Sequence, residues 1–448
     1  MNDGYFCQHA LVGGVVESSV RVTVAGGRFA SIDVGSEPEP ADRRLRGLTL
    51  PGLANVHSHA FHRALRSRTQ RESGSFWTWR DVMYRATEQL DPERYHALAR
   101  AVFAEMALAG ITAVGEFHYV HHQPDGTPYD DPNAMGEALL VAAADVGVRM
   151  VLLDTLYLHG GLDGAGYVEP TGAQLRFADR SAAAWADRVS QCRSDGDRRR
   201  LGAAIHSVRA VDPDAMGVVA AWAEDRHAPV HAHVSEQTGE NDACHERFAI
   251  TPLAVLHRSG AVTDRFTAVH ATHVTDHDIE LMAGTGSTVC MCPTTERDLG
   301  DGIGPTSRMV EAGLPLAVGS DSHAVIDAFE EARAIELDER LRSRRRGVHR
   351  ADDLFRAVSI SGHRSLGWDD AGTIAVDRRA DLVTVSLDSV RTAGAGPDAT
   401  LEAVVFAAAA SDVTHVVIDG RPIVTDGAHV DIDVPRALDE SIRALMGD

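Results

Sequence analysis

Histidine and carboxylate side chains occur in four short motifs, each of which follows an apolar, strand-like run. The motifs are His57-Ser58-His59, His231-Ala232-His233 with Glu236, His270-Ala271-Thr272-His273, and Ser320-Asp321-Ser322-His323. Imidazole nitrogens and carboxylate oxygens are ligands that a divalent ion such as Zn²⁺ takes from proteins. Because they follow several strands rather than one loop, they are typical of a barrel enzyme with a metal at one mouth. The pattern therefore predicts a metal-dependent hydrolase.

The His57/His59 pair is the strongest of these signals. Alternate residues of a strand point to the same side, so both imidazoles can reach one ion. A His-x-His pattern arises roughly once by chance in a chain with 23 histidines, so the pair gains weight from the strand-like run 51–56 before it. Of the second pair we expect only His233 to be a ligand, because it lies at the same distance past its strand as the other ligands do.

The other two motifs are expected to complete the site. Asp321 follows the apolar run 316–320, and a buried carboxylate at that place needs a cation. We expect that cation to be the metal, with a structural salt bridge as the alternative. His270 is expected either as a fourth imidazole ligand or as a donor beside the reacting carbon. His231 is expected in the barrel interior.

The residue content favours one metal ion over two. Two ions at about 3.5–4 Å need a bridging ligand between them. The chain contains no lysine that could be carbamylated for this purpose, and the run 203–207 offers no carboxylate. We therefore predict a single ion per chain, with zinc favoured by the nitrogen-rich ligand set.

The motifs fall at the ends of apolar runs that alternate with helical patterns between residues 51 and 370. Eight alternating units of this kind favour a closed (β/α)₈ TIM barrel, whose chemistry lies at the carboxyl ends of the strands. The expected strands are Gly52–Val56, Thr112–Phe117, Arg149–Thr155, Gly202–His206, Pro229–Val234, Phe266–His270, Ser287–Cys292 and Leu314–Ser320. The expected helices include Pro92–Leu108, Asn133–Val146, Ala215–Ala223 and Ile326–Leu341.

Short alternating strands also occur at both ends of the chain. Residues 19–24 and 29–34 form one pair of strand candidates around a glycine turn, and residues 381–387 and 415–420 form another. We predict one small β-sandwich domain assembled from residues 1–50 and 371–448, with the barrel, residues 51–370, inserted between them. Two separate β caps are the alternative.

The composition of the 448-residue chain narrows the class of partner. Its formal charge is −22, from 43 basic and 65 acidic residues, which argues against a nucleic-acid partner because phosphate binding needs a basic surface. An anionic substrate would need a local cluster of arginines. No apolar run reaches membrane-spanning length, and residues 1–14 lack the pattern of a signal peptide. The five cysteines show no zinc-cluster spacing, so we expect a cytoplasmic enzyme with reduced thiols.

Longer stretches of the sequence resemble a known family. The motifs Pro51-Gly52-Leu53 before His57-x-His59, His233-x-x-Glu236, His270 and Ser320-Asp321 match the mononuclear deaminase branch of the amidohydrolase superfamily. Within it the chain looks like the formimidoylglutamate deiminases. This similarity rests on His57-Ser58-His59-Ala60-Phe61, Phe76-Trp77-Thr78-Trp79-Arg80, Glu116-Phe117-His118-Tyr119-Val120-His121-His122, His206-Ser207-Val208-Arg209-Ala210-Val211, Val269-His270-Ala271-Thr272-His273 and Leu299-Gly300-Asp301-Gly302-Ile303. The Phe-Trp-Thr-Trp-Arg and Glu-Phe-His-Tyr blocks are far more specific than the metal motif, which many deaminases share.

The resemblance implies an activity and a role for each matching residue. The expected reaction is hydrolysis of N-formimidoyl-L-glutamate to N-formyl-L-glutamate and ammonia in histidine degradation, by a homodimer with one Zn²⁺ per chain. The resemblance implies zinc ligation by His57, His59, His233 and Asp321, and catalysis by Glu236 and His270 with Asp321 as proton acceptor. It also implies that Arg80, Tyr119, His206 and Arg209 hold the dicarboxylate part of the substrate. His62 stands where many family members have a substrate-contacting glutamine.

Two rival interpretations remain open. The first is a mononuclear deaminase of another amidine or aminated ring, such as guanine or an adenosine-type compound. The arginines argue against it, because a neutral ring would not need them. The second is a barrel that has lost catalysis and serves as a binding protein. It would be marked by loss of a ligand or of Glu236, and none is lost.

Overall fold

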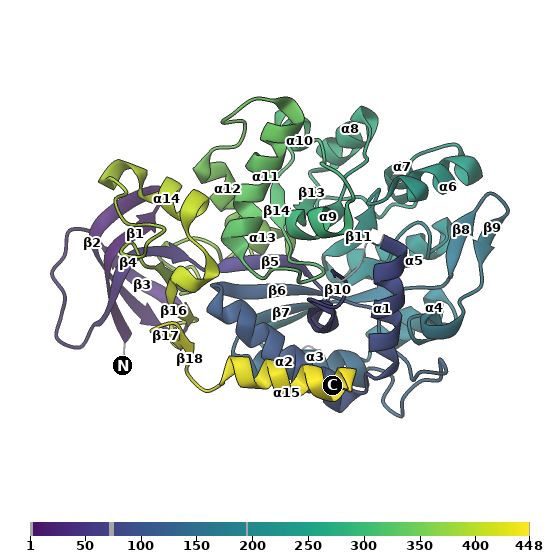
Figure 1. Cartoon of the computed structure of the whole chain (residues 1–448), viewed down its shortest axis with the longest axis horizontal. Coiled ribbons are helices and arrows are strands. Elements are labelled where there is room, and N and C mark those ends of the chain that lie inside the picture. The colour runs from purple at the N-terminus through teal and green to yellow at the C-terminus, as the bar shows by residue number, and fades with distance from the viewer. Residues whose placement is uncertain (1–2, 71–75, 194–195, 448) are drawn as a thin grey trace.

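The computed structural model describes residues 3–70, 76–193 and 196–447, without the side chains of residues 3, 76 and 77 (Figure 1). In this part of the chain two eight-stranded sheets lie side by side. One is an all-parallel sheet with strand order β14-β13-β12-β11-β10-β7-β6-β5, and the other has the order β18-β17-β16-β15-β4-β1-β2-β3. The first is the predicted barrel, and the second is built from both ends of the chain, so the predicted fold class is confirmed.

The barrel strands form where apolar residues run without interruption, as expected for strands buried on both faces. Their bounds are β5 Leu53–Ser58, β6 Ile111–His118, β7 Arg149–Leu156, β10 Arg199–Ile205, β11 Val230–Val234, β12 Phe266–His270, β13 Thr288–Met291 and β14 Leu316–Val318. All eight predicted strands are present, with ends that differ by up to three residues. A short hairpin of β8 Gly161–Asp163 and β9 Gly166–Val168 follows β7.

Helices cover the outside of the barrel (Figure 1). They are α1 Phe76–Glu88, α2 Pro92–Leu108, α3 Ala134–Val146, α4 Ala182–Val189, α5 Pro213–Arg226, α6 Thr238–Phe248, α7 Pro252–Arg258, α8 Asp276–Thr285, α9 Pro293–Leu299, α10 Thr306–Glu311, α11 Ala328–Ser343, α12 Ala351–Val358 and α13 Ile360–Ser365. Several begin at a side-chain cap, as α2 does at Asp91 and α5 at Asp212, each followed by proline at the first helical position. Helix α2 has the predicted bounds.

The barrel closes at the junction of its first and last strands, where two predicted metal ligands meet. The Asp321 amide donates to the carbonyl of His57 at 3.1 Å, and Ser58 and Asp321 form an isolated parallel bridge. Strand β14 ends at Val318, two residues before the predicted end at Ser320. At the next residue, Gly319, the chain packs directly against the backbone of His57. A side chain at Gly319 would place its Cβ atom 2.6 Å from Cβ and 2.8 Å from the carbonyl oxygen of His57. Only glycine fits this approach.

We therefore expect Gly319→Ala to destabilise the protein by about 1–3 kcal/mol, since the added methyl group forces the backbone of His57 to move. The same movement should lower metal content, because His57 and Asp321 flank the junction. Thermal unfolding and metal analysis test this. Gly217→Ala in helix α5 is the matched control, since its nearest neighbour would lie 3.8 Å away. An unchanged melting temperature for Gly319→Ala would contradict the steric argument.

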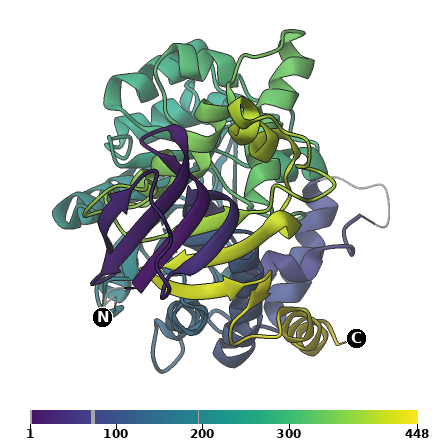
Figure 2. The same cartoon turned by 90° about the vertical axis from the view of Figure 1, so that its left-hand side faces the viewer.

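The second sheet combines N-terminal and C-terminal strands (Figure 2). Its strands are β1 Asp3–Val12, β2 Val15–Ala25, β3 Arg28–Asp33, β4 Arg43–Pro51, β15 Leu382–Val385, β16 Val413–Ile418, β17 Arg421–Thr425 and β18 Ala428–His429. The two ends are joined where β4 pairs with β15 in antiparallel register, Thr49 opposite Thr384. One face buries a small apolar cluster that includes Tyr5, Val22 and Phe29.

A buried arginine ties this sheet to the barrel. Arg149, at the start of β7, is fully buried and pairs with Asp381 and with Asp419, the latter at 2.8 Å. A buried guanidinium needs compensating carboxylates of this kind. The two ion pairs therefore hold the start of β7 against the ends of the second sheet's strands. Helix α14 Thr400–Ala407 follows β15, and the C-terminal helix α15 Val434–Met446 packs against α2 of the barrel. We propose the domain division at residues 50/51 and 370/371.

Two general expectations can be compared with the structure. All five cysteines are buried, and none of them forms a disulfide with another cysteine of the described chain. Among the described residues there is no helix that is both long and apolar enough to cross a membrane.

Candidate active site

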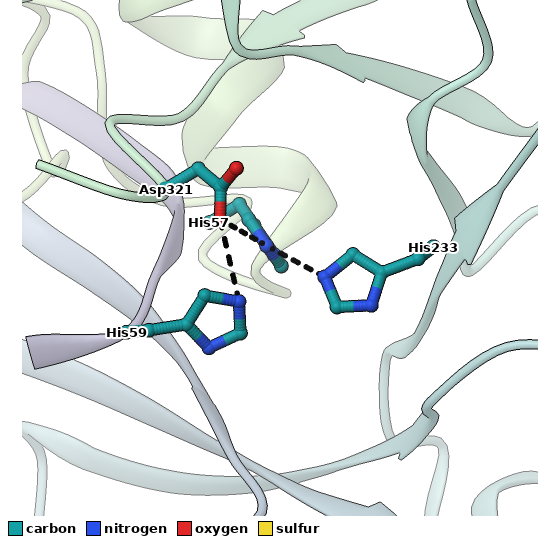
Figure 3. A group of neighbouring side chains, drawn as sticks. All are labelled: His57, His59, His233 and Asp321. Atoms are coloured by element: carbon teal, nitrogen blue, oxygen red, sulfur yellow. Dashed lines mark hydrogen bonds and ion pairs between the residues drawn. The ribbon is translucent and has the colours of Figure 1, made fainter. Parts of the chain in front are cut away.

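The four predicted metal ligands converge at the carboxyl ends of β5, β11 and β14 (Figure 3). His57 Nε2 lies 3.1 Å from His233 Nε2 and 3.3 Å from Asp321 Oδ1, and His59 Nε2 lies 3.3 Å from the same carboxylate oxygen. One ligand atom from each of the four residues lies within 4.8 Å of all the others. Segments separated by more than 260 positions in sequence thus meet around one point.

Hydrogen bonds on the far side of the rings prepare two of these histidines for a metal. His59 Nδ1 contacts the carbonyl of Phe117 at 2.8 Å, and His233 Nδ1 contacts the carbonyl of His206 at 2.9 Å. A carbonyl oxygen only accepts, so each Nδ1 carries the proton and each Nε2 keeps its lone pair. Those lone pairs face the shared point. The residues therefore fit a divalent cation.

The charges at this point agree with that conclusion. Burial lowers the pKa of His59 to about 3, so its imidazole is neutral at physiological pH. Burial alone would raise the pKa of Asp321, but the hydrogen bond from His57 and the positive charge of His270 hold it well below its usual range. Neutral imidazoles and one buried carboxylate leave a net negative charge, which a metal ion compensates. His231 is buried and contacts the carbonyl of Ser365 at 3.3 Å, away from the ligand group.

Glu236 and His270 lie beside the ligands, as the sequence predicts. His270 Nε2 is 3.8 Å from Glu236 Oε1 and 3.7 Å from Asp321 Oδ2, while His270 Nδ1 contacts Glu296 Oε1 at 3.4 Å. Burial would lower the pKa of His270, but the carboxylates of Glu236 and Glu296 hold it well above its usual range. His270 is therefore a hydrogen-bond donor in this arrangement.

Backbone strain is concentrated at the same place. Ser235, His270, Ala271 and Asp321 all have positive φ angles, between 39° and 67°. Such angles are unfavourable for residues with a side chain and persist where the surrounding structure enforces them, often at functional sites. Here they turn the chain sharply at the ends of β11, β12 and β14, which aims the polar side chains inward.

The site opens into a cavity of about 580 Å³. Among the predicted metal and catalytic residues, the cavity is lined by His59, His233, Glu236, His270 and Asp321. His57 lies beneath them and is fully buried. All five predicted substrate-binding residues also line the cavity: His62, Arg80, Tyr119, His206 and Arg209. The structure thus brings every predicted site residue together, although their roles remain predictions.

One wall of the cavity is aromatic and histidine-rich. His62 Nε2 and the Tyr119 hydroxyl are 3.0 Å apart, so the histidine in place of glutamine is tied to another predicted substrate contact. The Arg80 guanidinium lies 5.4 Å from the centre of the Tyr84 ring, in a cation–π arrangement. The side chain of the nearby Trp77 lies outside the described residues. Trp79 lines the cavity next to Arg80.

The cavity also contains a cationic residue with a buried partner. Arg209, in the loop after β10, has Nε at 3.7 Å from Glu240 Oε2. Glu240 lies on α6 and is 1% exposed, and burial raises the pKa of its carboxyl to about 7 although Arg209 opposes this shift. Glu240 is not among the site residues predicted from the sequence. No motif marks it, because its contact is with Arg209, which lies 31 positions away in the chain.

A second set of residues missed at the sequence level supports the ligand-bearing loop. Glu116, at the end of β6, accepts hydrogen bonds from Ser58 Oγ at 2.5 Å and from the Ala60 amide at 2.6 Å. Burial raises its pKa to about 8. His323 contacts both Ser58 and Ser320, at 3.2 and 3.0 Å. The one available signal was that Glu116 ends an apolar strand in the same way as the ligands do.

The remaining histidines of the Glu-Phe-His-Tyr block form a separate buried cluster. His118 and His121 lie near Asp154, close enough for a second metal group by distance alone. However, Arg188 donates to both oxygens of Asp154, at 2.9 and 2.8 Å, and His121 Nε2 contacts the carbonyl of Thr155 at 2.9 Å. The guanidinium already supplies the positive charge. This cluster is therefore a structural support under the loop that carries Tyr119.

Comparison with known proteins agrees with the fold and with the sequence motifs. The model of the amidohydrolase family matches residues 48–423. Formimidoylglutamate deiminase of Pseudomonas aeruginosa is 37% identical over 437 residues, which is 95% of each chain. 5-Methylthioadenosine/S-adenosylhomocysteine deaminase of Natronomonas pharaonis is 29% identical over 385 residues, 85% of this chain and 82% of that protein.

A solved structure resembles the chain over its whole length. An amidohydrolase from Brucella melitensis superimposes with a TM-score of 0.92 at 32% identity, covering 99% of this chain and 100% of that one. The resemblance to formimidoylglutamate deiminases drawn from the motifs is confirmed by these findings. The chain therefore belongs to the amidohydrolase family and is a hydrolase acting on carbon–nitrogen bonds.

Proposed function

We propose that the protein is a zinc-dependent deaminase that converts N-formimidoyl-L-glutamate and water to N-formyl-L-glutamate and ammonia, in histidine degradation. The observation that carries the proposal is that Arg80 and Arg209 line the same cavity as His59, His233 and Asp321. Two guanidinium groups beside a metal-ligand cluster suit an amidine substrate with two carboxylates. The Pseudomonas relative, at 37% identity, supports the same substrate.

His57, His59, His233 and Asp321 are proposed to hold one zinc ion. The ion would lower the pKa of a bound water toward neutrality and so supply the nucleophile at physiological pH. Asp321, whose second oxygen faces His270, is placed to accept the proton that this water loses. Its low pKa keeps the carboxylate ionised in the free enzyme.

Glu236 is proposed as the group that handles the substrate nitrogen. Its carboxylate can pair with the N–H groups of the cationic formimidoyl unit. After hydroxide has added to the carbon, it can take the proton of the new hydroxyl group and pass it to the terminal nitrogen, which leaves as ammonia while the formyl C=O bond forms. Burial raises the pKa of Glu236, which makes its carboxylate a better proton acceptor than an exposed one. His270, a donor held by Glu296, is proposed to orient the oxygen that attacks the formimidoyl carbon.

The glutamate part of the substrate is proposed to bind on the arginine side of the cavity. Arg209 and Arg80 would each face one carboxylate, since a guanidinium can donate two parallel hydrogen bonds to such a group. Tyr119, His206 and His62 would add single donors from the aromatic wall. Their burial strengthens these interactions relative to water, so short-range attraction exceeds the effect of the acidic surface.

Ammonia release tests the function against its rival. The purified protein should deaminate N-formimidoyl-L-glutamate at least 100-fold more efficiently than guanine, adenosine or methylthioadenosine, because these rings carry no carboxylate for the arginines. Equal or better turnover of a ring compound would overturn the proposed substrate. No turnover of any compound by metal-loaded protein would favour the binding-protein alternative.

Metal removal gives a further expected result. Dialysis against a chelator should abolish ammonia release, and one equivalent of Zn²⁺ per chain should restore it, because His57, His59, His233 and Asp321 form one set of four convergent ligands. Elemental analysis and a zinc titration measure this. Full activity in metal-free protein, or a requirement for two ions per chain, would contradict the single-ion assignment.

The remaining proposals follow from the family resemblance and the sequence. We propose that the enzyme acts in the cytoplasm as a homodimer on a small dicarboxylate. Sedimentation at several protein concentrations tests the oligomeric state.

A further inference from the structure

Glu240 is a buried carboxyl group in the wall of the substrate cavity. It lies on α6, one turn after the catalytic segment that follows β11, and it lines the cavity while being 1% exposed. Within the described residues, no side chain donates a hydrogen bond to either of its carboxylate oxygens, and among backbone groups the Ser235 amide favours its ionised form. A buried carboxylate with so few donors is unfavourable unless a charge or a bound ligand compensates it. The nearby Arg209, at 3.7 Å, is the compensating charge.

Few other charged groups lie around Glu240. Glu236 approaches from the end of β11 and raises its pKa, whereas Arg209 from the β10 loop and His270 from the end of β12 lower it. Cys244 lies on the same helix and keeps its thiol protonated, since burial raises its pKa to about 12. The titratable residues of the elements packed against α6, which are Asp163 on β8 and His257 and Arg258 on α7, do not line the cavity. Arg209 is therefore the main cation that Glu240 faces.

We propose that Glu240 neutralises Arg209 in the free enzyme and takes up one proton from solvent when a carboxylate of the substrate binds beside Arg209. The inference rests on the proposed function, because it assumes a substrate carboxylate at Arg209. Glu240 is then a positioning residue that holds Arg209 toward the cavity and makes dicarboxylate binding depend on pH.

The physical reason is that one guanidinium cannot compensate two buried carboxylates. A second negative charge within a few ångströms raises the pKa of a carboxyl group further, so binding and protonation of Glu240 favour each other. In the free enzyme the pKa of Glu240 is about 7. Below this pH the carboxyl is already protonated and binding requires no further proton. Above it, binding must draw a proton from solvent, so affinity falls as pH rises.

Calorimetric titration measures the proton directly. The zinc-loaded enzyme is titrated with N-formyl-L-glutamate, the proposed product, in two buffers of different ionisation enthalpy at pH 6 and at pH 8. Uptake should approach one proton per site at pH 8 and fall toward zero at pH 6, and the dissociation constant should rise by roughly tenfold per pH unit above the pKa.

Three variants test whether Glu240 is the residue that takes up the proton when N-formyl-L-glutamate binds. Glu240→Gln is always neutral, so it should bind without this proton uptake and should bind about tenfold more tightly than wild type at pH 8, with equal affinity at pH 6. Glu240→Asp retains a carboxylate and should keep the pH dependence. Glu246→Gln, an exposed position on the same helix, is the control and should behave as wild type. Circular dichroism confirms that each variant is folded.

The outcomes separate this inference from the proposed function. Proton uptake in wild type that disappears in Glu240→Gln supports the inference. Equal uptake in both proteins, no uptake in wild type, or no binding of N-formyl-L-glutamate at either pH overturns it. Ammonia release from N-formimidoyl-L-glutamate is measured separately on wild type. An enzyme that shows the linked proton but does not deaminate that compound would retain the inference and lose the function.

Discussion

Replacing Arg209 by alanine should reduce kcat/KM for N-formimidoyl-L-glutamate by roughly 100-fold while the zinc content stays at the wild-type level. Hydrogen bonds to a charged group contribute about 1.5–3 kcal/mol each, which corresponds to a factor of about 10–150. Arg209 lines the cavity but is not one of the four converging metal ligands. Steady-state kinetics with zinc analysis on the same preparation measures both quantities.

Two further variants make this result interpretable. Arg209→Ala leaves Glu240 buried without its cation, so part of any loss could come from altered folding. The double variant Arg209→Ala with Glu240→Gln removes that charge and should regain stability without regaining turnover. Arg247→Ala, at an exposed position on α6, is the matched control. A catalytic efficiency close to wild type in Arg209→Ala would refute the carboxylate-binding role.

Glu236→Gln is expected to have the largest effect on the chemical step. Proton transfer by a positioned side chain contributes about 100- to 10,000-fold to a rate, and glutamine cannot carry the proton to the leaving nitrogen. We expect kcat to fall by that amount with zinc content little changed, because glutamine has the same shape and Glu236 is not one of the four converging ligands. Ammonia release in single-turnover experiments measures the step without product release.

The control for this experiment is Glu246→Gln, which makes the same chemical change at an exposed site on the neighbouring helix. The Glu236 carboxyl lies 3.8 Å from His270 and raises the pKa of that imidazole. Loss of the Glu236 charge should therefore lower the pKa of His270. A variant that loses zinc would indicate a structural role instead. Rates near those of wild type would remove Glu236 from the proposed mechanism.

The barrel itself was predictable because its signals are local. A parallel strand buried on both faces is a continuous apolar run, and each run from residue 51 to residue 320 became a barrel strand. The polar residues at the end of each run then had to meet at one mouth, since parallel strands of a barrel end on the same side. The sequence alone therefore predicts that His57, His233 and Asp321 lie together.

Strand ends were less predictable, for a steric reason. The apolar run that contains Leu314 continues to Ser320, but β14 stops at Val318 because Gly319 lies against the backbone of His57. That contact joins the first and last strands, which are more than 250 positions apart. No local pattern reports it, because periodicity describes a residue's own strand and not the strand across the barrel closure.

The supporting residues of the site were missed for the same reason. Glu116 could be placed at the end of a strand, but nothing in its neighbourhood of sequence shows that it holds the amide of Ala60. Glu240 lies on a helix with ordinary polar residues, and only the fold shows that it is buried beside Arg209. Both act through partners far along the chain.

The sequence by itself determined the apolar runs, their alternation with helices, and the chemical types that follow each strand, because these properties depend on neighbouring residues. It also carried the family motifs. Three properties come from the tertiary structure: which side chains share a cavity, which ring nitrogen of His59 and of His233 carries the proton, and which carboxylates are buried. These depend on contacts across the barrel, where burial and the charge of a distant partner set the state of each group.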